Sequence, residues 1–300
     1  MRNLEAWSNR DPQSSKDRQG NPRRQRNRAE AIMAQDNTDS APPLGFLAVE
    51  VDIHRPPGDP FNQDTWPFPL IREKVTGTSE AQIVTNGDYE DTFIDRFVQA
   101  TIRLAERGAV GAITSCGFLA AAQTRYWDFQ PHPVTTSPAE HVRLAALSPI
   151  PVATSALVQV PSLLSIFPVN RPIGVLTYDS GRLGNAHLLE LDIDPNRVRV
   201  QGLSDESHLR DICARGASYD AGRLERELVA EAKSLIHRHP DISAVVLECT
   251  NMPPYADSIQ NAIQLPVYDV YTMGLWFYSG LTRRNPSAWK ASDTRNTWRR

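Results

Sequence analysis

The sequence predicts an α/β protein of two similar lobes, each with a parallel-type sheet, related by pseudo-twofold symmetry and enclosing an active site between them. From residue 44 to residue 281, short apolar segments alternate with segments of helical periodicity, which is typical of parallel sheets covered by helices on both faces. An apolar segment that ends in a cysteine occurs twice, at residues 111–118 (GAITSCGF) and 245–253 (VVLECTNMP). The two copies lie about one domain's length apart, so each lobe is expected to bring one cysteine to the cleft.

The first lobe is expected over residues 44–160. It begins with the apolar segment 44–51 (LGFLAVEV), a strand. Residues 52–69 are too rich in Pro, Gly and Asp for regular structure, and a loop of this length is a candidate wall of a site. The further elements expected are a strand at 82–86, a helix at 91–107 that Gly108 ends, a strand at 110–115, a short helix at 118–125 and a strand at 151–157.

The second lobe is expected over residues 161–281 and repeats the alternation. Residues 172–178 (PIGVLTY) open it as a strand. The elements that follow are a helix at 180–190, a strand at 198–203, a helix at 223–238, a strand at 242–249, a helix at 253–263 that two prolines open, a strand at 267–270 and a helix at 271–281. An exchange of strands between the lobes is left open.

Both ends of the chain are predicted to be tails. Residues 1–43 are basic and polar, with too few apolar residues to offset the entropy of ordering, and they contain no apolar core of a secretory signal. Met33 is an alternative start. Residues 282–300 form a polar C-terminal tail.

Composition limits the partners. The formal net charge of −3 gives no general signal for binding nucleic acid, and no run of about 18 apolar residues predicts a membrane span. The three cysteines are an odd number without paired spacing, which favours a reducing, cytoplasmic location over a disulfide framework. A small carboxylate is the expected partner, and a homo-oligomer is left open.

The cysteines Cys116 and Cys249 are the candidate catalytic residues. A thiol at a strand end and helix start meets unpaired backbone N–H groups that favour the thiolate, and the same groups can bind a carboxylate or an enolate. One such cysteine is more often a buried hydrophobe, but two at matched positions favour a functional pair. Ser115, Thr250 and Asn251 add polar side chains beside them.

These motifs resemble a known family. The segments SCGF (115–118) and LECTNMPPYA (247–256) resemble the two active-site motifs of the aspartate/glutamate/hydantoin racemase superfamily, and the resemblance extends over about 44–281. It implies cofactor-independent racemisation of amino acids or hydantoins or, with altered cysteines, decarboxylation or cis–trans isomerisation. It also implies that Cys116 and Cys249 are the opposed base and acid.

The chain departs from glutamate racemases at three places. They carry Asp-Ser-Gly after the first strand, where this chain has VEVD at 49–52, and Asn-Thr after the first cysteine, where it has Gly117 and Phe118. The histidine that follows their Cys-Thr is Asn251 here. The reaction class is therefore better defined than the substrate, and Phe118 indicates an apolar pocket.

The predicted substrate-binding residues lie at strand ends and in the loop that follows the first strand. They are Ser115, Gly117, Phe118, Thr250, Asn251, Thr177, Tyr178, Glu50 and Asp52. No metal is expected, because His237 and His239 do not share a helix face. No cofactor is expected either, because no lysine lies in a strand-end motif where pyridoxal phosphate would need one.

The function predicted first is a racemase or epimerase that moves a proton at a carbon next to a carboxylate or carbonyl, an isomerase that uses the cysteine pair. Two alternatives stay open. One is an isomerase or decarboxylase of the same superfamily that passes through an enediolate, and the other is a carboxylate-binding protein without turnover.

Overall fold

The structure is a computed structural model that describes residues 41–123 and 144–283. Most of the two predicted tails lies outside these residues, and so does the end of the helix predicted at 118–125.

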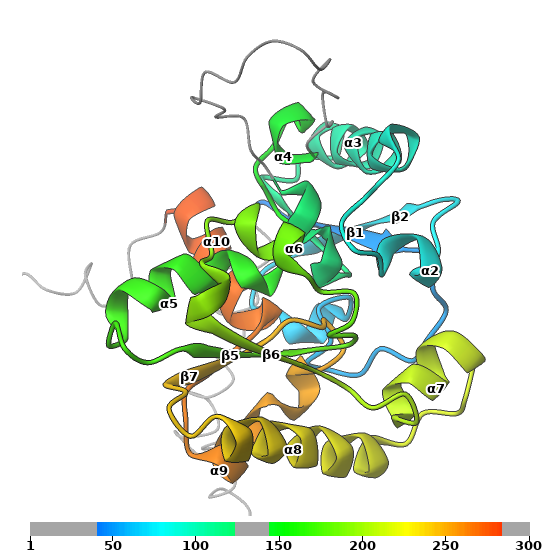
Figure 1. Ribbon diagram of the computed structural model, residues 1–300. Coiled ribbons are helices and arrows are strands. Elements are labelled where there is room, and N and C mark those ends of the chain that lie inside the picture. The colour runs from blue at the N-terminus through cyan, green and yellow to red at the C-terminus, as the bar shows by residue number, and fades with distance from the viewer. Residues whose placement is uncertain (1–40, 124–143, 284–300) are drawn as a thin grey trace, which may run out of the picture. The chain divides into compact units, whose positions relative to one another are not determined.

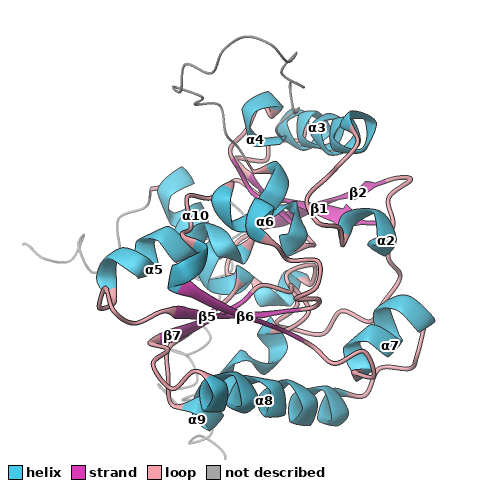
Figure 2. Cartoon of the chain, viewed as in Figure 1, coloured by secondary structure: helices cyan, strands magenta, loops and turns pink. Residues whose placement is uncertain are grey.

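Two parallel four-stranded sheets form the framework (Figure 2). The first has the order β2-β1-β3-β4, from β1 (Leu44–Val49), β2 (Leu70–Val75), β3 (Ala112–Thr114) and β4 (Val152–Ala153). The second has the order β6-β5-β7-β8, from β5 (Ile173–Thr177), β6 (Val198–Gly202), β7 (Ala244–Leu247) and β8 (Val267–Tyr268). Since each sheet places its four strands in the same sequence order, the predicted fold of two similar α/β lobes is confirmed.

Helices cover the sheets (Figure 1). In the second lobe, α5 and α8 both pack against β5, and Figure 1 shows them on opposite sides of the sheet. The α-helices are α2 (Glu80–Ile83), α3 (Asp91–Glu106), α4 (Leu144–Leu147), α5 (Val160–Ile166), α6 (Asn185–Leu189), α7 (His208–Arg215), α8 (Ala221–Arg238), α9 (Ala256–Ile263) and α10 (Val270–Leu281). Short 3-10 helices are η1 (Gln63–Thr65), η2 (Gly117–Ala122), η3 (Ala156–Gln159), η4 (Pro195–Arg197) and η5 (Pro253–Tyr255). None of the helices described combines the length and the apolar composition needed to cross a membrane.

Strand β1 is apolar throughout because both of its faces are covered. Leu44, Phe46 and Ala48 point to a cluster that includes residues of α10, while Leu47 and Val49 point to a cluster built largely on α3. Side chains alternate between the faces of a strand, so a strand buried on both sides reads as a continuous apolar run.

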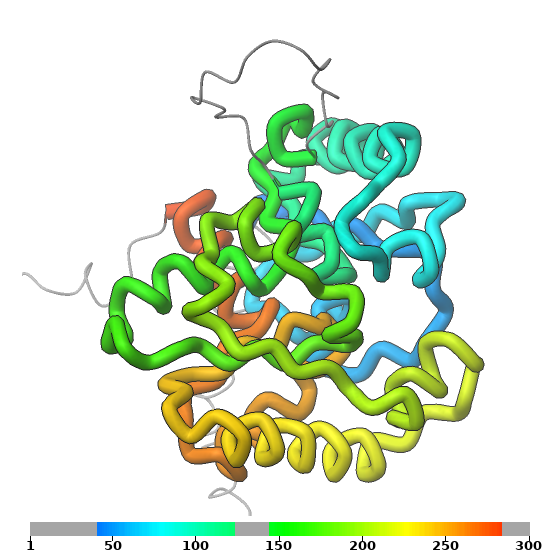
Figure 3. Tube along the Cα trace, viewed as in Figure 1, coloured from blue at the N-terminus to red at the C-terminus, as the bar shows by residue number. Residues whose placement is uncertain are grey.

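Some helices pack on the sheet formed by the other half of the sequence. The C-terminal helix α10 packs on the first sheet (Figure 3), where a Cβ on Gly274 would lie 2.4 Å from the ring of Trp66. The Tyr278 hydroxyl donates to the carbonyl of Pro42 at 2.6 Å. In the other direction, η3 and α5 contribute Leu157 and Val160 to the core of the second sheet. The exchange therefore involves helices, whereas the strands of each described sheet come from one half.

The secondary structure differs from the expected one at several places. Residues 82–86 are not a strand, because α2 begins at Glu80 and places Ile83 in the core. The second strand is instead β2, with the sequence LIREKV. This strand lies at the edge of its sheet and carries three charged residues, so its sequence lacks the apolar run by which the other strands were predicted. Helix α7 was not expected either, since only Leu209 and Ile212 of its apolar side chains are fully buried.

Candidate active site

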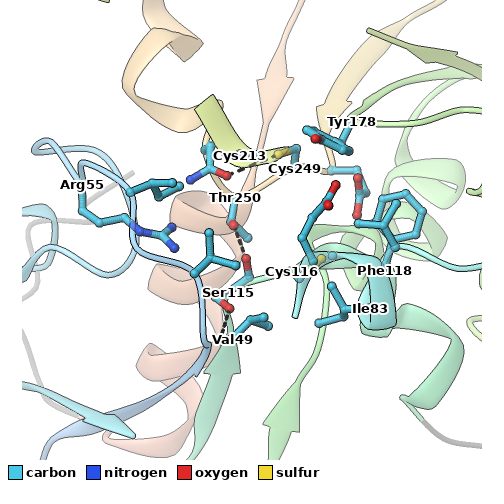
Figure 4. Close-up of a pocket in the computed structure, with 17 residues that line it drawn as sticks. Val49, Arg55, Ile83, Ser115, Cys116, Phe118, Tyr178, Cys213, Cys249 and Thr250 are labelled. Carbon is cyan, nitrogen blue, oxygen red and sulfur yellow. Dashed lines mark hydrogen bonds between the residues drawn. The ribbon is translucent and has the colours of Figure 1, made fainter. Parts of the chain in front are cut away.

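The two predicted catalytic cysteines occupy equivalent positions in the two lobes. Cys116 comes two residues after the end of β3 and Cys249 two residues after the end of β7, and each of these is the third strand along its sheet. Both thiols line one cavity of about 60 Å³. Figure 4 shows Cys249 and Tyr178 on one side of it, and Cys116, Ser115 and Ile83 on the other.

The wall of this cavity is largely apolar. Its lining residues come from the ends of β1, β3, β5 and β7, from the loop after β1, and from helices α2 and α7. They are Val49, Val51, Ile53, Arg55, Glu80, Ile83, Val84, Ser115, Cys116, Gly117, Phe118, Tyr178, Cys213, Glu248, Cys249, Thr250 and Asn251. Carboxyl ends of strands are where open α/β folds bind ligands.

The two cysteine strands are joined by a hydrogen bond between the lobes. The Thr250 hydroxyl donates to the carbonyl of Ser115 at 2.5 Å, and the Ser115 hydroxyl accepts the N–H of Val49 at 2.8 Å. All three residues are buried. Thr250 and Ser115 thus fix the strand ends that carry the thiols, and their direct contact with substrate stays a prediction.

The loop after β1 reaches the second lobe through Asp59, which is 1% exposed. One carboxylate oxygen, Oδ2, accepts from Asn251 Nδ2 at 3.0 Å and from Arg55 at 3.2 Å. This bond turns the other end of the Asn251 amide, Oδ1, toward the Cys249 sulfur at 3.8 Å. Asp59 therefore orients both the amide beside Cys249 and the guanidinium of Arg55. Arg55 lines the cavity and is labelled in Figure 4.

The thiols are less acidic than the sequence indicated. Burial raises the pKa of Cys116 and Cys249 above the ordinary value, and the negative charge of Glu248 adds to the rise. Backbone N–H groups do lie at both sulfurs, from Phe118 and Asn251, and lower the two pKa values by a smaller amount. The N–H groups favour the thiolate as expected, but the sequence argument left out the larger, opposite effect of the loss of solvation in a buried site.

A carboxylate that the motif analysis did not select lies beside the thiols. Glu248 is 1% exposed, and its Oε2 accepts from the Thr177 hydroxyl at 2.6 Å. Its Oε1 has no hydrogen-bond partner. Burial raises the pKa of Glu248 to about 7, against the hydrogen bonds from Thr177 and from the backbone of Tyr178.

Gly117 is required by this carboxylate. A Cβ at position 117 would lie 2.2 Å from Glu248 Oε1 and 2.6 Å from the Glu248 carbonyl oxygen, closer than nonbonded atoms approach. The glycine of the first motif therefore makes room for the glutamate of the second motif.

Most of the predicted site residues come together. Cys116, Cys249, Ser115, Gly117, Phe118, Thr250, Asn251 and Tyr178 line the cavity. Thr177 does not line it and acts behind the wall by holding Glu248. Glu50 and Asp52 are exposed and do not line it, and the Glu50 carboxylate instead accepts the N–H of Gly77 at 3.0 Å.

Four polar residues of the wall were not predicted individually: Arg55, Glu80, Cys213 and Glu248. Arg55 belongs to the loop that was expected to form a wall. Cys213 lies on α7 and lines the same cavity as the other two thiols. The signal for Glu248 was available, because a charged residue at the end of an otherwise apolar strand is unusual.

Comparison with known proteins adds two findings and one negative result. No family model matches the chain. The fold is similar to that of a mutant of arylmalonate decarboxylase in a sulfate-associated form, with a TM-score of 0.52, 16% identity, and coverage of 80% of this chain and 93% of that one. At this level of identity the likeness shows a shared fold, and this fold agrees with the two α/β lobes that the motif resemblance implied.

Curated proteins of similar sequence are lyases. A dimethylsulfoniopropionate lyase of Durusdinium sp. clade D is 28% identical over 243 residues, which cover 79% of this chain and 74% of that protein. Dimethylsulfoniopropionate lyase 5 of Emiliania huxleyi (strain CCMP1516) is 26% identical over 266 residues, which cover 84% of this chain and 48% of that protein. The chain thus spans about half the length of the second relative. The sequence similarity to proteins named as lyases favours the enzyme alternative over the racemase that was predicted first.

Proposed function

We propose that this protein is a lyase that removes a proton from the carbon next to a carboxylate and expels a leaving group from the following carbon. Dimethylsulfoniopropionate is the first substrate to test, because proteins named for its cleavage share 28% and 26% identity with most of this chain. The observation that carries the proposal is the single buried cavity that holds thiols from both lobes beside one guanidinium.

The reaction needs one base and no cofactor. A cysteine thiolate takes the proton from the carbon next to the carboxylate, and the electron pair of that C–H bond forms the new C=C bond. The C–S bond then breaks with its electron pair going to sulfur, so neutral dimethyl sulfide leaves and acrylate remains. The proton passes from the thiol to solvent, and charge and atoms balance.

The cavity residues suit these steps. The Arg55 guanidinium is a ligand for the substrate carboxylate, since guanidinium and carboxylate form strong paired hydrogen bonds. Backbone N–H groups of Phe118 and Asn251, which lie at the sulfurs, are placed to stabilise the negative charge that develops on the carboxylate. The wall of the cavity is largely apolar, and surroundings of low polarity strengthen each of these interactions.

The decisive experiment incubates the full chain with dimethylsulfoniopropionate and follows dimethyl sulfide by gas chromatography and acrylate by proton NMR. Cys116→Ser and Cys249→Ser are compared with Cys213→Ser, the matched control in the same cavity. A positioned general base contributes about 10²–10⁴-fold, so at least one of the first two variants should lose activity by about that factor. Cys213→Ser should stay within a few-fold of the unmodified protein. Absence of acrylate, or full activity in both Cys116→Ser and Cys249→Ser, contradicts the proposal.

Racemisation is the second candidate, because the two thiols line one cavity from opposite lobes. A racemase needs a base on one face of the carbon and an acid on the other, so both serine variants should lose activity comparably. In D₂O it should replace the α-proton of an amino acid, a hydantoin or a hydroxy acid without forming acrylate. A lyase requires only one of the two thiols as base, so unequal losses favour elimination.

A further inference from the structure

We propose that Glu248 binds the positively charged group of the substrate, which makes the site selective for a zwitterion with a sulfonium or quaternary ammonium group near its carboxylate. This inference rests on the proposed function and names the group that the acidic side of the cavity recognises.

Glu248 is a buried carboxylate without a cationic partner among the residues that the structure describes. Its Oε2 is satisfied by Thr177, but Oε1 has no hydrogen-bond partner and the side chain lines the cavity. Buried carboxylates are normally paired with a cation or fully hydrogen-bonded, because desolvating an unpaired charge is costly. A cationic ligand would supply the missing countercharge.

The charges of the cavity are divided in a way that suits a zwitterion. Arg55 is the one basic side chain of the described lining, and Asp59 orients it from outside the cavity. The acidic lining residues are Glu248 and Glu80, and the three thiols add groups that become negative when they ionise. One guanidinium for a carboxylate and one buried acid for a cation complement the two ends of dimethylsulfoniopropionate.

Glu80 is the competing candidate, and two observations favour Glu248 over it. Glu80 is half-buried rather than buried, so water already solvates part of its charge and a cation gains less there. Its carboxylate also faces the Tyr178 hydroxyl, whereas Glu248 Oε1 has no such partner. Glu80 therefore serves as the matched control.

The position of Glu248 couples binding to chemistry. Its negative charge contributes to the raised pKa of both Cys116 and Cys249. A cation bound against Glu248 offsets that charge, so the thiols become easier to ionise when the correct substrate is present. Glu248 is thus assigned a binding role, with an effect on the base that follows from it.

The test uses two ligands of the same shape and different charge, 3-(trimethylammonio)propanoate and 4,4-dimethylpentanoate. Their affinities for the unmodified protein, Glu248→Gln and Glu80→Gln are measured by isothermal titration calorimetry. A quaternary ammonium group has no N–H to donate, so its contact with Glu248 is electrostatic. Attraction between opposite charges in a partly desolvated site should make the unmodified protein prefer the cationic ligand by about 10–100-fold. Glu248→Gln should bind the two ligands about equally, and Glu80→Gln should keep the preference.

Three results overturn the inference: no preference in the unmodified protein, a preference that survives in Glu248→Gln, or one that is lost in Glu80→Gln. The readout is binding, so it separates this inference from the proposed function. A preference that Glu248→Gln abolishes, together with no release of acrylate, keeps the cation site and removes the lyase. Release of acrylate by a protein that does not prefer the cationic ligand keeps the lyase and removes the cation site.

A measurement on the unmodified protein covers the case in which Glu248→Gln does not fold. Glu248 loses its proton at a pH of about 7, so the preference for the cationic ligand should grow as the pH rises through this value. The other titratable groups that interact with Glu248 are Cys116, Cys249 and Tyr89, whose pKa values are all raised above this range. A preference independent of pH between about 6 and 8 contradicts the assignment.

Discussion

Replacing Glu248 with glutamine should stabilise the protein at alkaline pH. The substitution keeps the shape of the side chain and an oxygen that accepts from Thr177, but it removes the buried charge. In the folded protein the pKa of Glu248 is raised from 4.5 to about 7. A rise of this size corresponds to about 3 kcal/mol between the two protonation states.

The sign follows from linkage between protonation and folding. The folded protein holds the Glu248 proton more tightly than the unfolded chain, so protonation contributes stability that is fully present below the unfolded pKa of 4.5. That contribution declines as the pH rises and is lost once the pH passes the folded value of about 7. Relative to Glu248→Gln, the unmodified protein should therefore be less stable by up to about 3 kcal/mol at pH ~8 and nearly equal at pH ~4.5.

Guanidinium unfolding at these two pH values gives the free energy of unfolding of the variant and of the unmodified protein. The difference between the two proteins at one pH is then compared with their difference at the other pH. Charges elsewhere cancel when the variant is compared with the unmodified protein at each pH, and Glu80→Gln serves as a half-buried acidic control whose difference should stay small. A stability difference for Glu248→Gln that is the same at both pH values refutes the reasoning. So does a variant that is less stable than the unmodified protein at the higher pH.

Three further predictions concern the same site. Gly117→Ala should lower the free energy of unfolding by about 1–3 kcal/mol in thermal unfolding and reduce activity. The cause is the new Cβ, which would lie 2.2 Å from Glu248 Oε1. Unchanged stability would show that the strand ends can separate. Asp59→Ala should lower activity about 10–100-fold and stability by about 2–4 kcal/mol, because Asn251 and Arg55 lose their shared acceptor; activity assays with denaturant unfolding check both. All three cysteines should react slowly with iodoacetamide in the folded protein at neutral pH, since burial raises each pKa; rapid labelling of any one, followed by mass spectrometry, would contradict this.

The sequence predicted every described strand except the edge strand β2, and it missed the helices α4, α5 and α7. Strands such as β1 and β7 carry an uninterrupted apolar run because helices cover both sides of them. The edge strand β2 carries Arg72, which donates to the carbonyl of Phe61, Glu73, which pairs with Arg103 of α3, and Lys74, which is exposed. Its pattern therefore resembles that of a surface segment. Helix α7 was not predicted because only Leu209 and Ile212 of its apolar side chains are buried, so its sequence also resembles that of a surface segment.

The candidate site was predictable as far as the motifs extend. Cys116 and Cys249 carry a local signal, an apolar strand that ends in a turn, and the structure brings both into one cavity. Arg55 and Cys213 reach that cavity only through the placement of a loop and of α7, which local patterns do not encode. The ionisation of the thiols was mispredicted because burial is a property of the complete fold.

The exchange of helices has a consequence for how the chain folds during its synthesis. Strand β1 is made early, yet one of its faces is covered by α10, which is made more than two hundred residues later, and the contact between Tyr278 and Pro42 spans 236 residues. Until α10 leaves the ribosome, the apolar side chains of Leu44 and Phe46 lack their final cover. Contacts this distant in sequence slow folding, and exposed apolar surface in partly made chains promotes aggregation. The first lobe is therefore expected to stay incomplete, and dependent on chaperones, until translation reaches the second lobe's last helix.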